Sequence, residues 1–160
     1  MSDLHEFHTV RGYQLLEQNS KSLTPAMEDY IEMIYRSNSK EGYIRTSTLS
    51  ELLNVKPPSV SKMIQKLTNM GLVNYKKYGI ISLTMSGNEL GKFLLERHNI
   101  IESFLKNIGA NHNTFVETEL IEHSISASTV GRIKLLNALF ESNPDLIADL
   151  DRYIHPDLNE

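Results

Sequence analysis

Three side chains of types that bind metal ions stand close together in the second half of this 160-residue chain. Glu119, Glu122 and His123 are spaced i, i+3 and i+4, so a helix would present all three on one face. Two carboxylates and an imidazole, without sulfur, suit a hard-to-borderline divalent cation such as Mn²⁺ or Fe²⁺, and Zn²⁺ is also compatible. The same spacing is typical of a solvated acidic helix face, and the pattern alone leaves both interpretations open.

Other candidate ligands lie far away in the sequence. Asp29 and Glu32 form a second i, i+3 pair on an expected first helix, and His98 follows the apolar pair Leu94-Leu95 on an expected long helix. Periodicity does not show that these helices bring their side chains together. No role is assigned to the remaining histidines, which are His5, His8, His112 and His155.

A second group of side chains is suited to bind DNA. Residues 45–77 contain six Lys and Arg but a single acidic residue, Glu51, whereas residues 86–160 contain six basic and twelve acidic residues. The whole chain has a net charge of −4. A basic segment on an acidic chain indicates a local contact with a polyanion, although a solvated lysine-rich face would have the same composition.

The elements expected around this basic segment form a winged helix-turn-helix. A helix begins at Pro25 with Thr24 as its cap. A short helix over residues 48–53 follows, with Ser47 as its cap, and its inward-facing side chains are Leu49, Leu52 and Leu53.

The second helix of the expected motif begins at Pro57-Pro58 and ends near Met70, where Gly71 stops it. Two β-rich runs, residues 72–75 and 80–83, then form a hairpin with a basic tip. Helix, turn, helix and hairpin occur in the order of a winged helix-turn-helix domain.

In such a domain the second helix enters the major groove, where Ser, Gln and Lys reach base edges and phosphates. The N-terminus of the preceding helix and the wing contact the DNA backbone. The residues predicted to contact DNA are Thr46, Ser47, Lys56, Pro57, Ser59, Ser61, Lys62, Gln65, Lys66, Lys76 and Lys77.

The second half of the chain is expected to be entirely helical. Its apolar positions are abundant for short helices, which favours a helix-packed homodimer. We expect three parts: an N-terminal arm or short helix (1–22), a winged helix-turn-helix domain (23–85) and a helical metal-binding and dimerisation domain (86–160). The fold class is therefore mostly α, with a small β-hairpin wing.

The composition excludes several classes of protein. The chain has no cysteine, which rules out disulfides, zinc ribbons and thiolate catalysis. No apolar run approaches the roughly 20 residues that cross a bilayer, and the first residues do not resemble a secretory signal. We therefore expect a cytoplasmic protein that has no membrane partner.

Four segments together resemble the diphtheria-toxin-repressor family, and specifically its manganese-transport-regulator branch. They are Leu23–Tyr35, Val55–Met63, Glu96-Arg97-His98 and Ile121-Glu122-His123. The resemblance covers roughly residues 23–142. The wing tip, Tyr78-Gly79-Ile80, differs from the Arg-Gly that many relatives carry.

This resemblance implies a repressor that binds double-stranded operator DNA as a homodimer when Mn(II) is bound, and that controls manganese uptake genes. It implies a paired metal site with two ions per subunit, whose ligands are Asp29, Glu32, His98, Glu119, Glu122 and His123. Iron-sensing relatives have Met in place of Asp29 and Cys in place of Glu119, so oxygen at both positions resembles the manganese branch.

Three alternatives remain open at this point. The same fold can sense Fe(II), or a winged-helix regulator can respond to a small organic effector. A metal-dependent hydrolase that uses the Glu-x-x-Glu-His run is the third, but the chain has no nucleophile or phosphate-binding motif in support of it. We therefore expect a protein that is not an enzyme.

Overall fold

The computed structural model describes residues 23–37, 42–110 and 112–154, except for the side chains of residues 151 and 154. The expected N-terminal arm, residues 1–22, lies outside the described residues. The chain divides into two compact units, Met1–Leu95 and Glu96–Glu160, so the division falls within the long helix α5 (Met85–Asn107). The domain boundaries expected from the sequence remain predictions.

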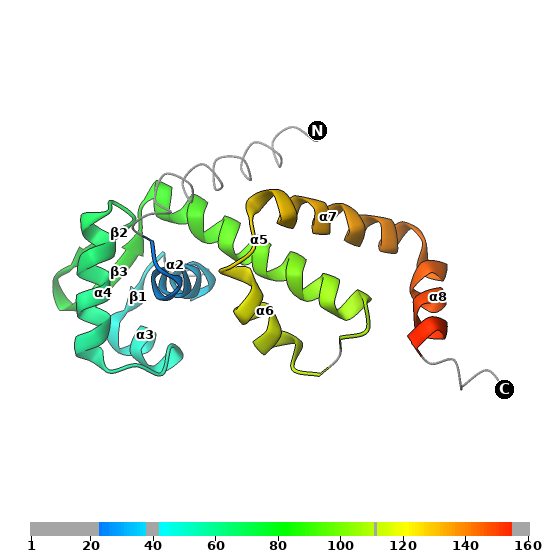
Figure 1. Cartoon of the computed structure of the whole chain (residues 1–160). Helices are drawn as coiled ribbons and strands as arrows, with labels where there is room; N and C mark the ends of the chain where they lie inside the picture. Colours follow the sequence, from blue (N-terminus) through cyan, green and yellow to red (C-terminus); the bar gives the residue numbers. More distant parts are fainter. Residues whose placement is uncertain (1–22, 38–41, 111, 155–160) are drawn as a thin grey trace. The chain divides into compact units, whose positions relative to one another are not determined.

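The first unit has the element order of a winged helix-turn-helix (Figure 1). Its elements before α5 are α2 (Pro25–Ser37), β1 (Ile44–Arg45), α3 (Thr46–Leu52), α4 (Pro57–Asn69), β2 (Val73–Lys76), the 3₁₀ turn η1 (Lys77–Gly79) and β3 (Ile80–Leu83). The strands form one antiparallel sheet in the order β1-β3-β2.

Local sequence signals explain where most of these helices begin and end. The Thr24 hydroxyl accepts a hydrogen bond from the Met27 amide at 3.4 Å, and the Thr84 hydroxyl accepts one from the Gly87 amide at 3.1 Å. Gly71 has φ +72° after the end of α4, the left-handed conformation that glycine adopts without strain. The expected start of α2 and the expected stop of α4 are thus confirmed, and Thr84 caps α5.

Helix α3 differs from the expectation in two ways. It begins at Thr46 after the extended residue Arg45, and no side chain caps it, so Ser47 is not its cap. The reason is that Arg45 belongs to β1 and is paired with Ile80, which fixes the start of the helix. Leu52 is 49% exposed whereas Leu49 is fully buried, because residues three apart on a helix point about 60° away from each other.

One hydrophobic core holds the first unit together. It combines residues of α2, α3, α4, the sheet and the first part of α5. The fully buried side chains of α4 are Val60, Ile64 and Leu67, at the i, i+4, i+7 spacing of an inward helical face. The opposite face of α4 is therefore left to solvent.

The second unit consists of helices. The last part of α5 packs with α6 (Thr114–Glu122) and α7 (Ala127–Ser142) around Ile101, Leu105 and Val130, and α8 (Pro144–Ile154) follows. Ser126 caps α7, as its hydroxyl accepts a hydrogen bond from the Thr129 amide at 3.2 Å. The expected helical second half is confirmed.

Large apolar side chains remain on the surface of the second unit. Leu135 on α7 is 63% exposed, and the other exposed apolar side chains of α6 to α8 are Phe115, Val116, Leu120, Leu136, Leu139, Leu146 and Tyr153. Isolated exposed leucines are common, so these side chains become evidence for a subunit interface only together with a dimerisation function. Within the described residues, no helix has the length and apolarity needed to cross a membrane.

Candidate metal centre and DNA-binding face

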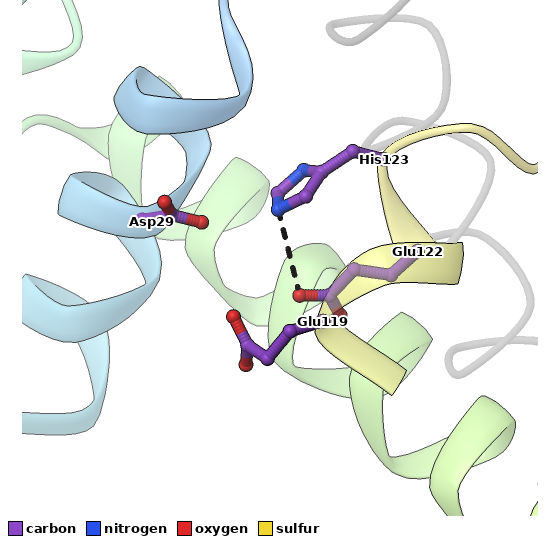
Figure 2. A group of neighbouring side chains, drawn as sticks. All are labelled: Asp29, Glu119, Glu122 and His123. Carbon is purple, nitrogen blue, oxygen red and sulfur yellow. Dashed lines mark ion pairs between the residues drawn. The ribbon is translucent and has the colours of Figure 1, made fainter. Parts of the chain in front are cut away.

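The helix α6 brings three candidate ligands of the second unit together. Glu119 and Glu122 lie on α6 and His123 follows at its C-terminal end (Figure 2). Donor atoms of these three residues lie within 4.8 Å of one another, and Nε2 of His123 is 3.7 Å from Oε1 of Glu122. The spacing in the sequence therefore does place these side chains on one side of a helix.

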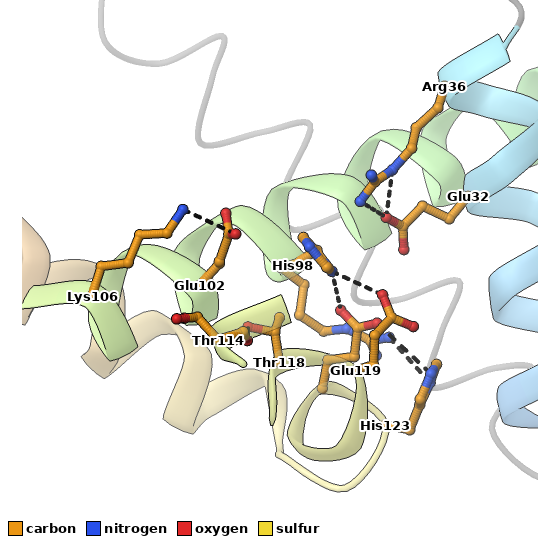
Figure 3. A network of polar contacts seen from close by, with 11 residues as sticks. Glu32, Arg36, His98, Glu102, Lys106, Thr114, Thr118, Glu119 and His123 are labelled. Atoms are coloured by element: carbon orange, nitrogen blue, oxygen red, sulfur yellow. Dashed lines mark hydrogen bonds and ion pairs between the residues drawn. The ribbon is translucent and has the colours of Figure 1, made fainter. Parts of the chain in front are cut away.

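His98 of α5 joins this group from a position 24 residues away. Its Nδ1 lies 3.2 Å from Oε2 of Glu122 and 3.4 Å from Oε1 of Glu119 (Figure 3). His98 and Glu122 are both buried, the latter to 1% exposure. A buried carboxylate is costly unless hydrogen bonds or a cation compensate its charge, and here an imidazole faces it.

The donor set fits a divalent cation. Two ligand atoms that share a cation at about 2.1 Å are separated by about 3.0 to 3.4 Å in octahedral or tetrahedral geometry, and the His98–carboxylate distances are of this size. Oxygen and imidazole nitrogen without sulfur are the donors that Mn²⁺ and Fe²⁺ accept. The second unit therefore carries a cluster with the chemistry of a metal site.

Arg97 is a residue at this cluster that the sequence patterns did not assign. It is 3% exposed, and its Nη2 lies 3.5 Å from Nδ1 of His123. This contact places a buried positive charge next to one of the candidate ligands. Nothing in the spacing of Arg97 distinguishes it from a surface arginine, because its burial depends on the packing of α5 with α6.

The two remaining candidate ligands, Asp29 and Glu32, lie on α2 of the first unit. Glu32 is buried, and its Oε1 accepts hydrogen bonds from Nε and Nη2 of Arg36 at 2.9 and 2.5 Å (Figure 3). The i, i+4 arginine thus holds one oxygen of this carboxylate. Asp29 is half-buried, so both carboxylates are held partly out of water.

The face of α4 opposite the core has the chemistry of a recognition helix. The residues of this helix and of its N-cap that are predicted to contact DNA are all exposed: Lys56, Pro57, Ser59, Ser61, Lys62, Gln65 and Lys66. Exposed lysines and hydroxyls on one helix face match the requirement for phosphate and base-edge contacts. Their contacts with DNA remain predictions.

The wing and the start of α3 carry the other predicted DNA contacts. Ser47, Lys76 and Lys77 are exposed, whereas Thr46 is half-buried. The Thr46 hydroxyl donates a hydrogen bond to the Gly79 carbonyl at 3.1 Å. While this bond holds, the hydroxyl proton of Thr46 is not available to a phosphate.

The chain matches two family models that follow one another along the sequence. Residues 22–81 match the iron dependent repressor, N-terminal DNA binding domain. Residues 84–147 match the iron dependent repressor, metal binding and dimerisation domain.

Two transcriptional regulators are similar to this chain over most of its length. The HTH-type transcriptional regulator MntR of Lysinibacillus sphaericus is 43% identical over 129 residues, which are 80% of this chain and 93% of the relative. The regulator of the same name from Oceanobacillus iheyensis is 41% identical over 132 residues, 82% of this chain and 90% of the relative.

Among solved structures, the manganese regulator SloR is similar with a TM-score of 0.62 and 34% identity, over 72% of this chain and 55% of the SloR chain. This chain thus spans about half the length of that solved relative.

These similarities decide between the classes of function left open by the sequence. The two matched domains bind DNA and bind metal, so neither a hydrolase nor a regulator with an organic effector describes this chain. The chain belongs to the iron-dependent repressor family, and it is a metal-dependent, DNA-binding transcriptional repressor with a dimerisation domain.

Proposed function

We propose that Mn²⁺ is the metal that activates this repressor and that manganese uptake genes are its targets. The observation that carries the proposal is the donor set of the second unit, where the imidazole of His98 lies within 3.4 Å of the carboxylates of Glu119 and Glu122 and no sulfur is present. Mn²⁺ prefers oxygen and imidazole ligands. The names of the MntR relatives and of the manganese regulator SloR support the same metal.

We further propose that two ions bind per subunit, with six residues as ligands. The second unit contributes His98, Glu119, Glu122 and His123, and α2 contributes Asp29 and Glu32. The support is chemical: four carboxylates and two imidazoles match the charge of two divalent cations. Arg36 contacts Oε1 of Glu32. Glu32 can therefore bind a metal ion through its other oxygen while Arg36 stays in place, or through both oxygens if Arg36 moves away.

The same charges explain how metal controls DNA binding. Without a positive charge between them, the four carboxylates of the proposed site repel one another. Two divalent cations, when bound, supply the positive charge that offsets these carboxylates. The ligands on α2 and α6 then favour one arrangement of the DNA-binding and dimerisation domains, and the metal and DNA affinities are coupled, typically by about 1–3 kcal/mol.

We propose that the dimer binds an operator through the exposed face of α4, with the two recognition helices one helical turn of DNA or a multiple apart. Because its operator lies on the chromosome, we propose that the protein acts in the cytoplasm. Lysines on α4 and the wing supply the phosphate contacts. The exposed leucines of α7 belong to the subunit interface in this proposal.

Fe²⁺ is the second candidate metal, because the matched family models are those of iron-dependent repressors. The two metals are distinguished at Asp29. Exchange of this carboxylate for a thioether, in Asp29→Met, is expected to weaken activation by Mn²⁺ more than activation by Fe²⁺, since Mn²⁺ gains less from sulfur.

Anaerobic DNA-binding titrations of the wild type and Asp29→Met with each metal give the concentrations of Mn²⁺ and of Fe²⁺ that produce half-maximal activation. If the Mn²⁺ concentration rises by a larger factor than the Fe²⁺ concentration in the variant, the result supports Mn²⁺ selection by oxygen at this position. An unchanged ratio shows that Asp29 does not select the metal, and a wild type activated by Fe²⁺ but not by Mn²⁺ overturns the manganese proposal.

A further inference from the structure

The tip of the wing holds a tyrosine in a conformation that tyrosine rarely adopts. Tyr78 has φ +68° and ψ +23°, the left-handed region, and Gly79 follows with φ +73°. Among the described residues, the other non-glycine positions with positive φ are Asn54 and Asn113. Asparagine tolerates this region, whereas a bulky side chain there costs of the order of 1 kcal/mol or more.

Burial of the Tyr78 ring does not offset this strain. It is 89% exposed, although aromatic rings are among the side chains that gain most from leaving water. Asparagine or glycine would make the same turn without strain. An exposed aromatic ring in a strained turn is therefore better explained by a contact outside the subunit than by the fold.

The surroundings of the ring indicate the nature of that contact. Lys76 and Lys77 precede Tyr78 and are exposed, and no acidic residue lies between Asn74 and Leu83. Two exposed lysines directly before an exposed tyrosine suit the sugar–phosphate backbone of DNA, because lysines neutralise phosphates and a phenol hydroxyl donates to phosphate oxygen.

The orientation of the tip is fixed from the helix-turn-helix side. The Thr46 hydroxyl at the start of α3 donates to the Gly79 carbonyl at 3.1 Å. An added Cβ at Gly79 would lie only 2.9 Å from the Thr46 oxygen, so the close approach requires glycine. Pairing of Arg45 with Ile80 joins the same two segments through the backbone.

We infer that Tyr78 is a DNA-contacting residue, whose ring and hydroxyl lie against the sugar–phosphate backbone, and that Thr46 is the residue that positions it. This inference rests on the DNA-binding function of the chain and not on the choice of metal. A backbone contact carries no base information, so loss of Tyr78 weakens binding to all sequences alike.

The chain has no tryptophan, so Tyr78→Trp places a single fluorescent reporter at the wing tip. The experiment uses the full chain saturated with Mn²⁺, or with Fe²⁺ if only iron activates it. The DNA is a duplex that the wild type has selected from a random-sequence pool. DNA should change the emission of the reporter and protect it from iodide quenching. Tyr153 is the matched control, since it is 86% exposed on α8 and Tyr153→Trp should show no such protection.

Tyr78→Asn tests the energetic role of the ring. Because asparagine tolerates the left-handed turn, the variant should unfold at the same temperature as the wild type or higher. Its affinity should fall by roughly two- to tenfold per wing, the effect of one lost hydrogen-bonded contact, and equally for selected and unselected duplexes of the same length. Undiminished affinity in Tyr78→Asn, or a reporter that stays open to iodide on saturating DNA, overturns the inference.

A double-mutant cycle tests the role of Thr46. If Thr46 acts through the tip, Thr46→Val weakens binding in the wild type but has little further effect in Tyr78→Asn, while Thr46→Ser retains the affinity. Additive losses would show that Thr46 contacts DNA independently, which contradicts the positioning role. A wild type that binds DNA equally with metal and with chelator contradicts the metal proposal instead, and leaves the reporter measurement valid.

Discussion

Replacement of Glu122 by glutamine should remove the stabilisation of the protein by metal. Glu122 is 1% exposed and contacts His98 and His123, so the isosteric Glu122→Gln leaves no cavity. The glutamine oxygen can still accept a hydrogen bond from His98, but it lacks the negative charge of a carboxylate ligand. Most of the change should therefore appear in metal affinity and little in the metal-free fold.

The expected size follows from the linkage between binding and folding. Metal at a hundred times its Kd stabilises the wild type by about 2.7 kcal/mol, which for a chain of this length corresponds to a rise in Tm of roughly 5–11 °C. If the variant binds about a hundredfold more weakly, the same metal concentration stabilises it by about 0.4 kcal/mol. Its Tm should then rise by only about 1–2 °C.

Calorimetry with Mn²⁺ and with EDTA gives this difference for each variant separately, so any effect on the metal-free fold cancels. Glu117→Gln is the matched control, because Glu117 lies on the same helix α6 but is exposed. It should retain the full metal-induced shift. A full shift in Glu122→Gln would refute the assignment of this carboxylate to the metal site.

Three further perturbations test the packing, the dimer and the DNA face. Gly91→Ala places a Cβ 2.6 Å from that of Tyr35, whereas the Cβ of Gly131→Ala meets nothing within 4 Å. In urea unfolding, the free energy of unfolding should fall by roughly 1–3 kcal/mol in the first variant and rise by up to about 1 kcal/mol in the second. Equal effects would contradict the packing of α5. Leu135→Glu puts a charge on an exposed leucine of α7, and sedimentation should detect monomers, whereas an intact dimer would place the interface elsewhere. Lys62→Ala should reduce the slope of log affinity against log salt by roughly 0.9 per subunit, and an unaltered slope would remove this lysine from the phosphate contacts.

Local patterns predicted those parts of the fold that depend on neighbouring residues. Thr24 and Gly71 act at helix ends as predicted from their residue types. The strand β1 was not predicted, because two residues show no periodicity and Ile44 becomes a strand residue only by pairing with Ile81. The same long-range pairing explains why the start of α3 was misplaced.

The candidate metal site divides in the same way. The i, i+3, i+4 spacing predicted one face for Glu119, Glu122 and His123, since it depends on a single helix. The approach of His98 to Glu122 could not be derived from spacing, because it depends on how α5 packs with α6. The burial of Arg97 beside His123 depends on the same packing.

The most direct test of manganese-dependent repression is a titration of operator binding with metal. DNA recovered by the wild type from a random-sequence pool is titrated with the full chain in the presence of Mn²⁺, anaerobic Fe²⁺, Zn²⁺ or EDTA. We expect the Kd in Mn²⁺ to be about 5- to 150-fold lower than in EDTA, the range of a typical coupling free energy, and Mn²⁺ to activate at least as strongly as Fe²⁺. Equal affinity in Mn²⁺ and in EDTA would contradict metal-dependent repression by this chain.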